Sequence, residues 1–154
     1  MTTITALRTL RIQEHPNLIW VELETDDGLT GLGESFRGAE AVEAVLHAQV
    51  APWLIGRDAQ QIEAVSHHLM SPYLGFHSSS AETRAASAVD LALWDLAGKR
   101  LGVPVHTALG GRVRDAIPVY NTCAGYQFNT AGAARRDVGL ADKPAGPYDD
   151  QIAF

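Results

Sequence analysis

Two carboxylates, Asp90 and Asp95, are the side chains that most suggest acid–base chemistry in this sequence. A pair of carboxylates can pass protons to and from a substrate when both face the same site. These two lie five residues apart in a segment with a helical pattern, so they do not share a face of the helix. The spacing therefore favours structural roles for both, such as hydrogen bonds and caps at a domain interface.

Other motifs fail on spacing or lack a partner. Glu63 and His67 are four residues apart and could share a metal ion, but no third ligand is close to them in the sequence. Gly31-Leu32-Gly33 resembles the start of a dinucleotide-binding fingerprint, but Phe36 stands where the next glycine is required. Gly98-Lys99 lacks the upstream glycine and the following Ser or Thr of a phosphate-binding loop.

The composition indicates a folded globular chain. Of its 154 residues 46% are hydrophobic, and the formal net charge of −6 argues against nonspecific binding to nucleic acid or to an anionic membrane. The sequence shows neither a signal peptide nor an apolar run of roughly 20 residues that would span a membrane. The one cysteine, Cys123, cannot form an intramolecular disulfide and is predicted to be a packed thiol. We therefore expect a soluble cytoplasmic protein.

The elements that must position these residues begin with three strands. Residues 3–12, 18–25 and 29–34 alternate as strands do, and Asp26-Asp27-Gly28 predicts a tight turn between the last two. The first strand is expected to place four apolar side chains on one face, interrupted by Arg8: Ile4, Ala6, Leu10 and Ile12. The second is expected to bury one face: Ile19, Val21 and Leu23. Short connections indicate an antiparallel meander.

Helical periodicity follows the strands. One helix is expected over residues 39–50 and should end near Pro52, because proline disrupts a helix interior. A second should begin after Asp58, which is predicted to be its N-cap with Gln61 as the capping-box partner.

The clearest helix runs from about residue 81 to residue 100. Ser79 and Glu82 are predicted to form a capping box at its start, and Gly102 and Pro104 should stop it.

The remaining sequence predicts a short helical turn at 105–109, a strand over 116–122 and loop over 129–154. Three strands followed by a helical bundle predict an α+β domain.

The long helix and its exit carry a specific motif. Residues 85–99 read AASAVDLALWDLAGK, and Pro104-Val105 and Leu109-Gly110 follow in register. This run resembles the signature of the mandelate racemase and muconate lactonizing group of the enolase superfamily, with Ala108 standing where leucine is usual. Three further stretches resemble the same family in the expected order: VELETDDGLTGLGES, LIGRDAQQIE and IPVYNTCAGY.

The resemblance implies a two-domain enzyme. Residues 1–112 would form an enolase N-terminal domain-like cap, and residues 113–154 would begin a TIM-type (β/α) barrel that is incomplete in this chain. Family members abstract a proton next to a carboxylate and stabilise the resulting enediolate on Mg²⁺. The general base and the acidic metal ligands come from later barrel strands, so no catalytic residue and no metal ligand is assigned here. The parent protein is expected to be a lyase and this chain alone to be inactive.

The resemblance also implies which residues meet a substrate. The run Glu34 to Arg37 matches the family's second specificity loop, and Glu14 to Asn17 matches the first. Arg37 could pair with a substrate carboxylate, although a solvated loop arginine is the simpler interpretation, and Phe36 could instead pack between domains. The substrate-binding candidates are Ser35, Phe36, Arg37, Asn121 and Thr122.

The most specific functional prediction is an acid-sugar (aldonate or aldarate) dehydratase. A racemase, an epimerase or a cycloisomerase of the same superfamily is the alternative. A noncatalytic interaction module, whose apolar cap surface meets a partner, is the alternative from another class. The expected partners are a small carboxylate substrate, the protein's own barrel and further copies in a homo-oligomer.

Overall fold

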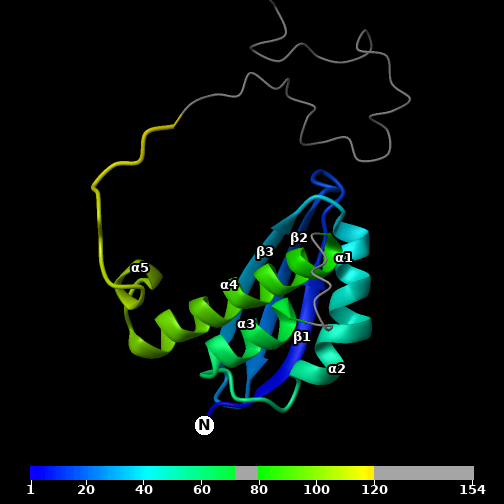
Figure 1. Cartoon of the computed structure of the whole chain (residues 1–154), viewed down its shortest axis with the longest axis horizontal. Helices are drawn as coiled ribbons and strands as arrows, with labels where there is room; N and C mark the ends of the chain where they lie inside the picture. The colour runs from blue at the N-terminus through cyan, green and yellow to red at the C-terminus, as the bar shows by residue number, and fades with distance from the viewer. Residues whose placement is uncertain (72–79, 120–154) are drawn as a thin grey trace, which may run out of the picture.

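A computed structural model of the chain describes residues 1–71 and 80–119 (Figure 1). An antiparallel sheet of order β1-β2-β3 is followed by helices, which confirms the predicted α+β meander and helical bundle. The strands are β1 (Ile4–Leu10), β2 (Leu18–Thr25) and β3 (Thr30–Phe36). The helical elements are α1 (Ala39–Val45), the π-helix η1 (Leu46–Val50), α2 (Ala51–Leu54), α3 (Ile62–Met70), α4 (Ala81–Leu101) and α5 (Val105–Ala108).

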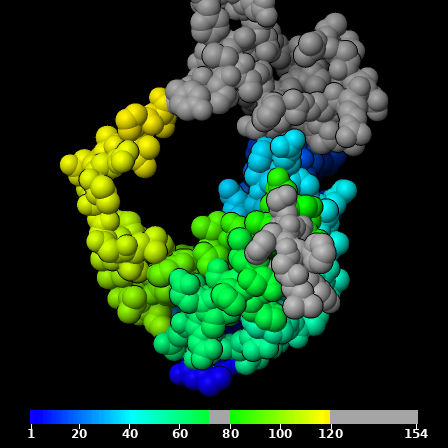
Figure 2. Space-filling view, in the orientation of Figure 1, coloured from blue at the N-terminus to red at the C-terminus, as the bar shows by residue number. Residues whose placement is uncertain are grey.

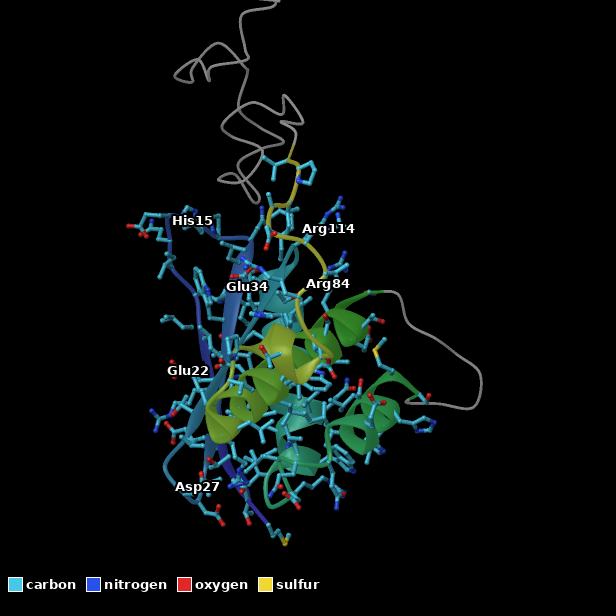
Figure 3. All side chains as sticks on the ribbon, turned by 90° about the vertical axis from the view of Figure 1, so that its left-hand side faces the viewer. His15, Glu22, Asp27, Glu34, Arg84 and Arg114 are labelled. Atoms are coloured by element: carbon cyan, nitrogen blue, oxygen red, sulfur yellow. The ribbon has the colours of Figure 1, made fainter. Side chains whose placement is uncertain are left out.

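One face of the sheet is covered and the other is open. The predicted face of β2 is fully buried, with Ile19, Val21 and Leu23 all at 0% exposure. The helices α1 to α4 lie over this face, so that in Figure 3 the sheet and the helices form two layers. The hydrophobic core lies between these layers.

The predicted apolar face of β1 is wrong. The pairing of β1 with β2 shifts register between Ile4 and Ala6, as a β-bulge does. An extra residue reverses the alternation, so Leu7 joins Ile4 in the core, while Leu10 is 55% exposed. Ile12, which lies beyond the strand, is 37% exposed.

The long helix α4 packs directly against β3. Its predicted apolar residues are all buried: Ala85, Val89, Ala92, Leu93 and Leu96. A Cβ at Gly33 would stand 1.9 Å from the Ala88 carbonyl oxygen, and one at Gly31 would stand 2.2 Å from that of Ala92. The Gly31-Leu32-Gly33 run therefore serves close contact between strand and helix.

The first helical segment, predicted over residues 39–50 with an end near Pro52, runs two residues past that proline. It continues through η1 into α2 and ends at Leu54. The π-helical turn stands immediately before α2, where Pro52 occupies one of the first two positions. The backbone stays in the right-handed helical region from η1 into α2, so Pro52 lies inside a continuous helical run, and the π-helical turn before it is a common irregularity of such runs.

Two predicted helix starts also differ from the structure. Asp58 is not the N-cap of α3, because that helix begins after Gln61. The Asp58 carboxylate instead accepts hydrogen bonds from the amides of Thr2 at 3.2 Å and Gln60 at 3.1 Å, which ties the N-terminus to this turn. Helix α4 has Ser80 at its N-cap position, and Ser79 lies outside the described residues.

The exit from α4 is close to prediction. Gly102 adopts a left-handed conformation with φ 66° and ends the helix, and α5 follows. The predicted strand over 116–122 is absent from residues 116–119, which pair with no other described segment, and its remainder lies outside the described residues, as does the predicted loop over 129–154. No helix in the described ranges is both long and apolar enough to cross a membrane.

Candidate functional site

The two predicted specificity loops meet at one end of the sheet. The amide of Arg37 donates to the Asn17 carbonyl oxygen at 2.7 Å, and Leu18 pairs with Phe36 in the β2–β3 register. We refer to residues 11–17 and 35–38 as the loop end. His15 and Glu34 lie toward this end in Figure 3, and Asp27 lies at the other. Antiparallel pairing thus joins two segments that are twenty residues apart in the sequence.

Arg37 has an unusual backbone. Its φ is 77°, in the left-handed region that side chains other than glycine rarely adopt. Gly38 follows with φ 71° and begins α1, so the chain reverses between the sheet and the helix. Backbone strain of this kind concentrates at binding sites. The Arg37 side chain is exposed and has no ion-pair partner among the described residues, so its guanidinium is free to bind an anion.

The other candidate residues take different positions. Ser35 is 8% exposed and lies on the covered face of β3, whereas Phe36 is 41% exposed on the open face. At the loop end, Phe36 and Arg37 are therefore the candidates that face solvent. Asn121 and Thr122 lie outside the described residues.

Asp95 has the structural role predicted for it. Its carboxylate accepts a hydrogen bond from the Leu32 amide at 2.8 Å and one from Lys99 Nζ at 2.7 Å. Lys99 also donates to the Thr30 carbonyl oxygen at 2.7 Å. Two residues of the α4 motif thus satisfy backbone groups on the outer edge of β3, which would otherwise be open to pairing with another strand.

The described residues contain no group of three or more His, Cys, Asp or Glu side chains that could hold a metal ion. Glu63 and His67 therefore do not form the core of a metal site in this part of the chain. The family resemblance places all the Mg²⁺ ligands on later strands of the barrel.

The opposite end of the sheet, which we call the turn end (residues 25–30 and 56–60), has two shifted carboxyl groups. A hydrogen bond from the Thr25 hydroxyl, with further contributions from the Leu29 amide and Arg100, lowers the pKa of Asp27. Hydrogen bonds from the amides of Gln60 and Thr2 lower the pKa of Asp58. Because both groups are held by the fold itself, neither is placed to react with a ligand.

A groove lies at the outer edge of β3, between the open face of the sheet on one side and α4 and α5 on the other. It has a volume of about 500 Å³ and contains two half-buried tryptophans. Its main apolar lining residues are Trp20, Leu32, Leu91, Trp94 and Val105. The segment after α5 stands away from the body of the domain (Figure 2).

Comparison with known proteins gives the family. Residues 3–110 match the family model for the mandelate racemase / muconate lactonizing enzyme N-terminal domain. The chain is 40% identical over 126 residues to a D-mannonate dehydratase of Rhizorhabdus wittichii, covering 79% of this chain and 31% of that protein. It is 41% identical over 125 residues to a D-galactonate dehydratase of Verminephrobacter eiseniae, with the same two coverages.

Solved structures agree. An enolase protein from environmental sequencing of the Sargasso Sea is 69% identical with a TM-score of 0.76, covering 83% of this chain and 34% of that one. An enolase from Pantoea ananatis with bound D-gluconate and Mg is 35% identical with a TM-score of 0.69, covering 76% and 29%. The chain thus spans about a third of the length of these relatives. It belongs to the mandelate racemase and muconate lactonizing enzyme family of the enolase superfamily, and residues 3–110 are the N-terminal domain of that family.

Proposed function

We propose that this chain is the capping part of an acid-sugar dehydratase that depends on Mg²⁺. The relatives named D-mannonate dehydratase and D-galactonate dehydratase support this activity over a racemase, epimerase or cycloisomerase. The relative with D-gluconate and Mg supports an aldonate substrate and this metal.

The reaction removes the proton on the carbon next to the substrate carboxylate and the hydroxyl on the following carbon. Water leaves, and the enol that remains becomes a 2-keto-3-deoxy acid. When bound, Mg²⁺ stabilises the enediolate formed by proton loss. The described residues offer no cluster to hold this ion, and its ligands and the general base are proposed to come from later strands of the barrel.

The part played by this chain is to cover and select the substrate. The observation that carries this proposal is the loop end, where a backbone hydrogen bond from Arg37 to Asn17 joins two exposed loops and the Arg37 guanidinium has no ion-pair partner in the described chain. A guanidinium binds a carboxylate through two parallel hydrogen bonds. Arg37 would therefore recognise an anionic end of the acid sugar, and Phe36 would exclude water beside it.

The groove beside α4 is proposed to dock the protein's own barrel. Its apolar lining, with Trp20 and Trp94, is the kind of surface that an interdomain contact buries. The same groove supports the second candidate, a noncatalytic module that binds a separate partner. A homo-oligomer stays a prediction.

The test is an activity assay of the protein extended through its barrel. D-Mannonate, D-galactonate and D-gluconate are supplied with Mg²⁺, and formation of the 2-keto acid is followed. We expect at least one substrate to be dehydrated and a chelator to abolish turnover. Activity that survives the chelator would contradict the proposal. Epimerisation without loss of water would instead favour the racemase alternative.

The matched variants are Arg37→Gln and Arg114→Gln. Both arginines lack an ion-pair partner in the described chain, but only Arg37 lies at the loop end. Arg37→Gln should raise KM by about tenfold or more, because a charge-assisted contact is lost. Arg114→Gln should leave KM unchanged. An equal change in KM in the two variants would show that Arg37 has no specific role in binding the substrate.

A further inference from the structure

A polar network joins the end of β1 to α1 next to the loop end. Arg11 Nε lies 2.9 Å from Glu43 Oε2, and the Thr9 hydroxyl donates to Glu43 Oε1 at 2.9 Å. The same Thr9 oxygen lies 2.8 Å from His47 Nε2. Arg11 also reaches the exposed Glu40 at 3.4 Å. One carboxylate on α1 therefore meets two residues where β1 gives way to the β1–β2 connection.

The direction of each hydrogen bond follows from the number of protons. Thr9 has one hydroxyl proton, and an ionised carboxylate only accepts. That proton goes to Glu43, so the Thr9 oxygen accepts from His47, and the His47 proton resides on Nε2. Glu43 uses one oxygen for Thr9 and the other for Arg11. Both carboxylate oxygens are thus engaged, one by each partner, and we call these two contacts the Glu43 anchor.

The connection that this anchor holds has little else to position it. Arg11 is its first residue, and Ile12 to His15 are exposed. At its far end the Asn17 carbonyl oxygen accepts from the Arg37 amide. The connection is thus fixed at both ends and largely bare between them. Its position therefore depends on the contacts at its two ends rather than on buried side chains.

We propose that Glu43 is a positioning residue for the connection between β1 and β2. By pairing with Arg11 it holds residues 11–17 against α1, so that the connection and the Phe36–Gly38 turn form one rigid unit. What this unit covers rests on the proposed function. The anchoring itself is a property of the chain that is measurable without activity.

The test is amide exchange by NMR in the Glu43→Gln variant. Glutamine keeps the shape of the side chain and an oxygen for Thr9, but it loses the charge that binds Arg11. Inside the connection the His15 amide donates to Ile12 and the Leu18 amide to His15, so these two amides report its opening. Their exchange should accelerate about two- to fivefold. Exchange of Val21 and Leu23, in the central strand, should not change.

The control variant is Glu40→Gln. Glu40 faces the same arginine but is 86% exposed and lies 3.4 Å away, so its neutralisation should leave the His15 and Leu18 amides unchanged. The double variant Arg11→Glu with Glu43→Arg restores a pair of opposite charges. Its His15 and Leu18 amides should exchange more slowly than those of Arg11→Glu alone or Glu43→Arg alone.

Unchanged exchange at His15 and Leu18 in Glu43→Gln would overturn the proposal. An equal rise at Val21 and Leu23 would also overturn it, because Glu43 would then contribute only to general stability. If the His15 and Leu18 amides exchange as fast in the double variant as in its two single variants, pairing with Arg11 is not the means by which Glu43 acts. None of these outcomes depends on turnover, so failure of the dehydratase assignment would be seen separately, in the activity assay.

Discussion

The two ends of the sheet are held in different ways. At the turn end, Asp27 accepts a hydrogen bond from the Thr25 hydroxyl at 2.6 Å and pairs with Arg100 of α4, while Asp58 accepts from the Thr2 amide. At the loop end the contacts lie at the edges of the exposed segments, and Arg37 adopts a strained backbone with its guanidinium unpaired in the described chain.

This difference indicates that the two ends have different roles. The carboxylates at the turn end stabilise the fold, since each already accepts hydrogen bonds from other residues of the domain. A polar group at the loop end remains available to a ligand, and local strain is tolerated there because the contact between β3 and α4 holds the strand in place. Four predictions test this contrast.

The largest loss of stability is expected at the contact between β3 and α4, on which both ends of the sheet depend. Gly33→Ala would place a Cβ 1.9 Å from the Ala88 carbonyl oxygen, so β3 and α4 must separate. We expect a loss of about 3 kcal/mol in the free energy of unfolding, as for overpacking in a core. Urea denaturation followed by circular dichroism measures this.

Gly28→Ala is the control for that substitution. A Cβ at Gly28 meets nothing within 4 Å, but its φ of +83° makes alanine strained. The expected loss is about 1 kcal/mol. Similar losses at the two glycines would mean that the close contact of β3 with α4 is not what supports the sheet.

Arg37→Gly should act in the opposite direction at the loop end. Glycine accepts the φ of 77° without strain, so the variant should gain about 1 kcal/mol of stability. In the extended enzyme the same variant should bind substrate more weakly. Arg37→Gln keeps the strain and loses only the charge, so it should weaken binding without the gain. A loss of stability in Arg37→Gly would show that the arginine side chain supports the fold.

Asp95→Asn tests the protection of the β3 edge. The side chain keeps an oxygen for the Leu32 amide but loses its charge toward Lys99. For a partly exposed pair the expected loss is about 0.5 kcal/mol, with faster amide exchange at Leu32. Asp90→Asn, on another face of the same helix, should change neither. Unaltered amide exchange at Leu32 in Asp95→Asn would show that Asp95 and Lys99 do not protect the edge of β3.

The smallest expected effect is the change in stability at acidic pH. The pKa values of Asp27 and Asp58 are lowered from the ordinary 3.8 in the folded protein. Their contribution to stability is therefore present above that value and is lost as the pH falls through the lower folded pKa. The urea midpoint should be level from neutral pH down to about pH 5 and should then decline. Asp27→Asn should reduce this decline, and a decline unchanged in both Asp27→Asn and Asp58→Asn would place the acid sensitivity elsewhere.

The candidate site could be predicted only in part. The loop sequence Glu34 to Arg37 was identified by its resemblance to the family, but its left-handed backbone and its hydrogen bond to Asn17 have no local sequence signal. Ser35 was placed with Phe36 and Arg37, although strand alternation puts it on the opposite face of β3. No local pattern predicts the contact between Arg11 and Glu43, because these residues are 32 positions apart and only folding brings them together.

The sequence by itself determined the elements whose signals are local. Alternation defined β2, the Asp26-Asp27-Gly28 turn joined it to β3, and the small apolar residues with Gly102 defined α4 and its end. Tertiary structure decided the rest: which face of β1 is buried, how the helix passes Pro52, and what Asp58 and Asp95 bind. The physical reason is that a local pattern fixes backbone conformation, whereas the partner of a polar side chain depends on which distant segments pack beside it.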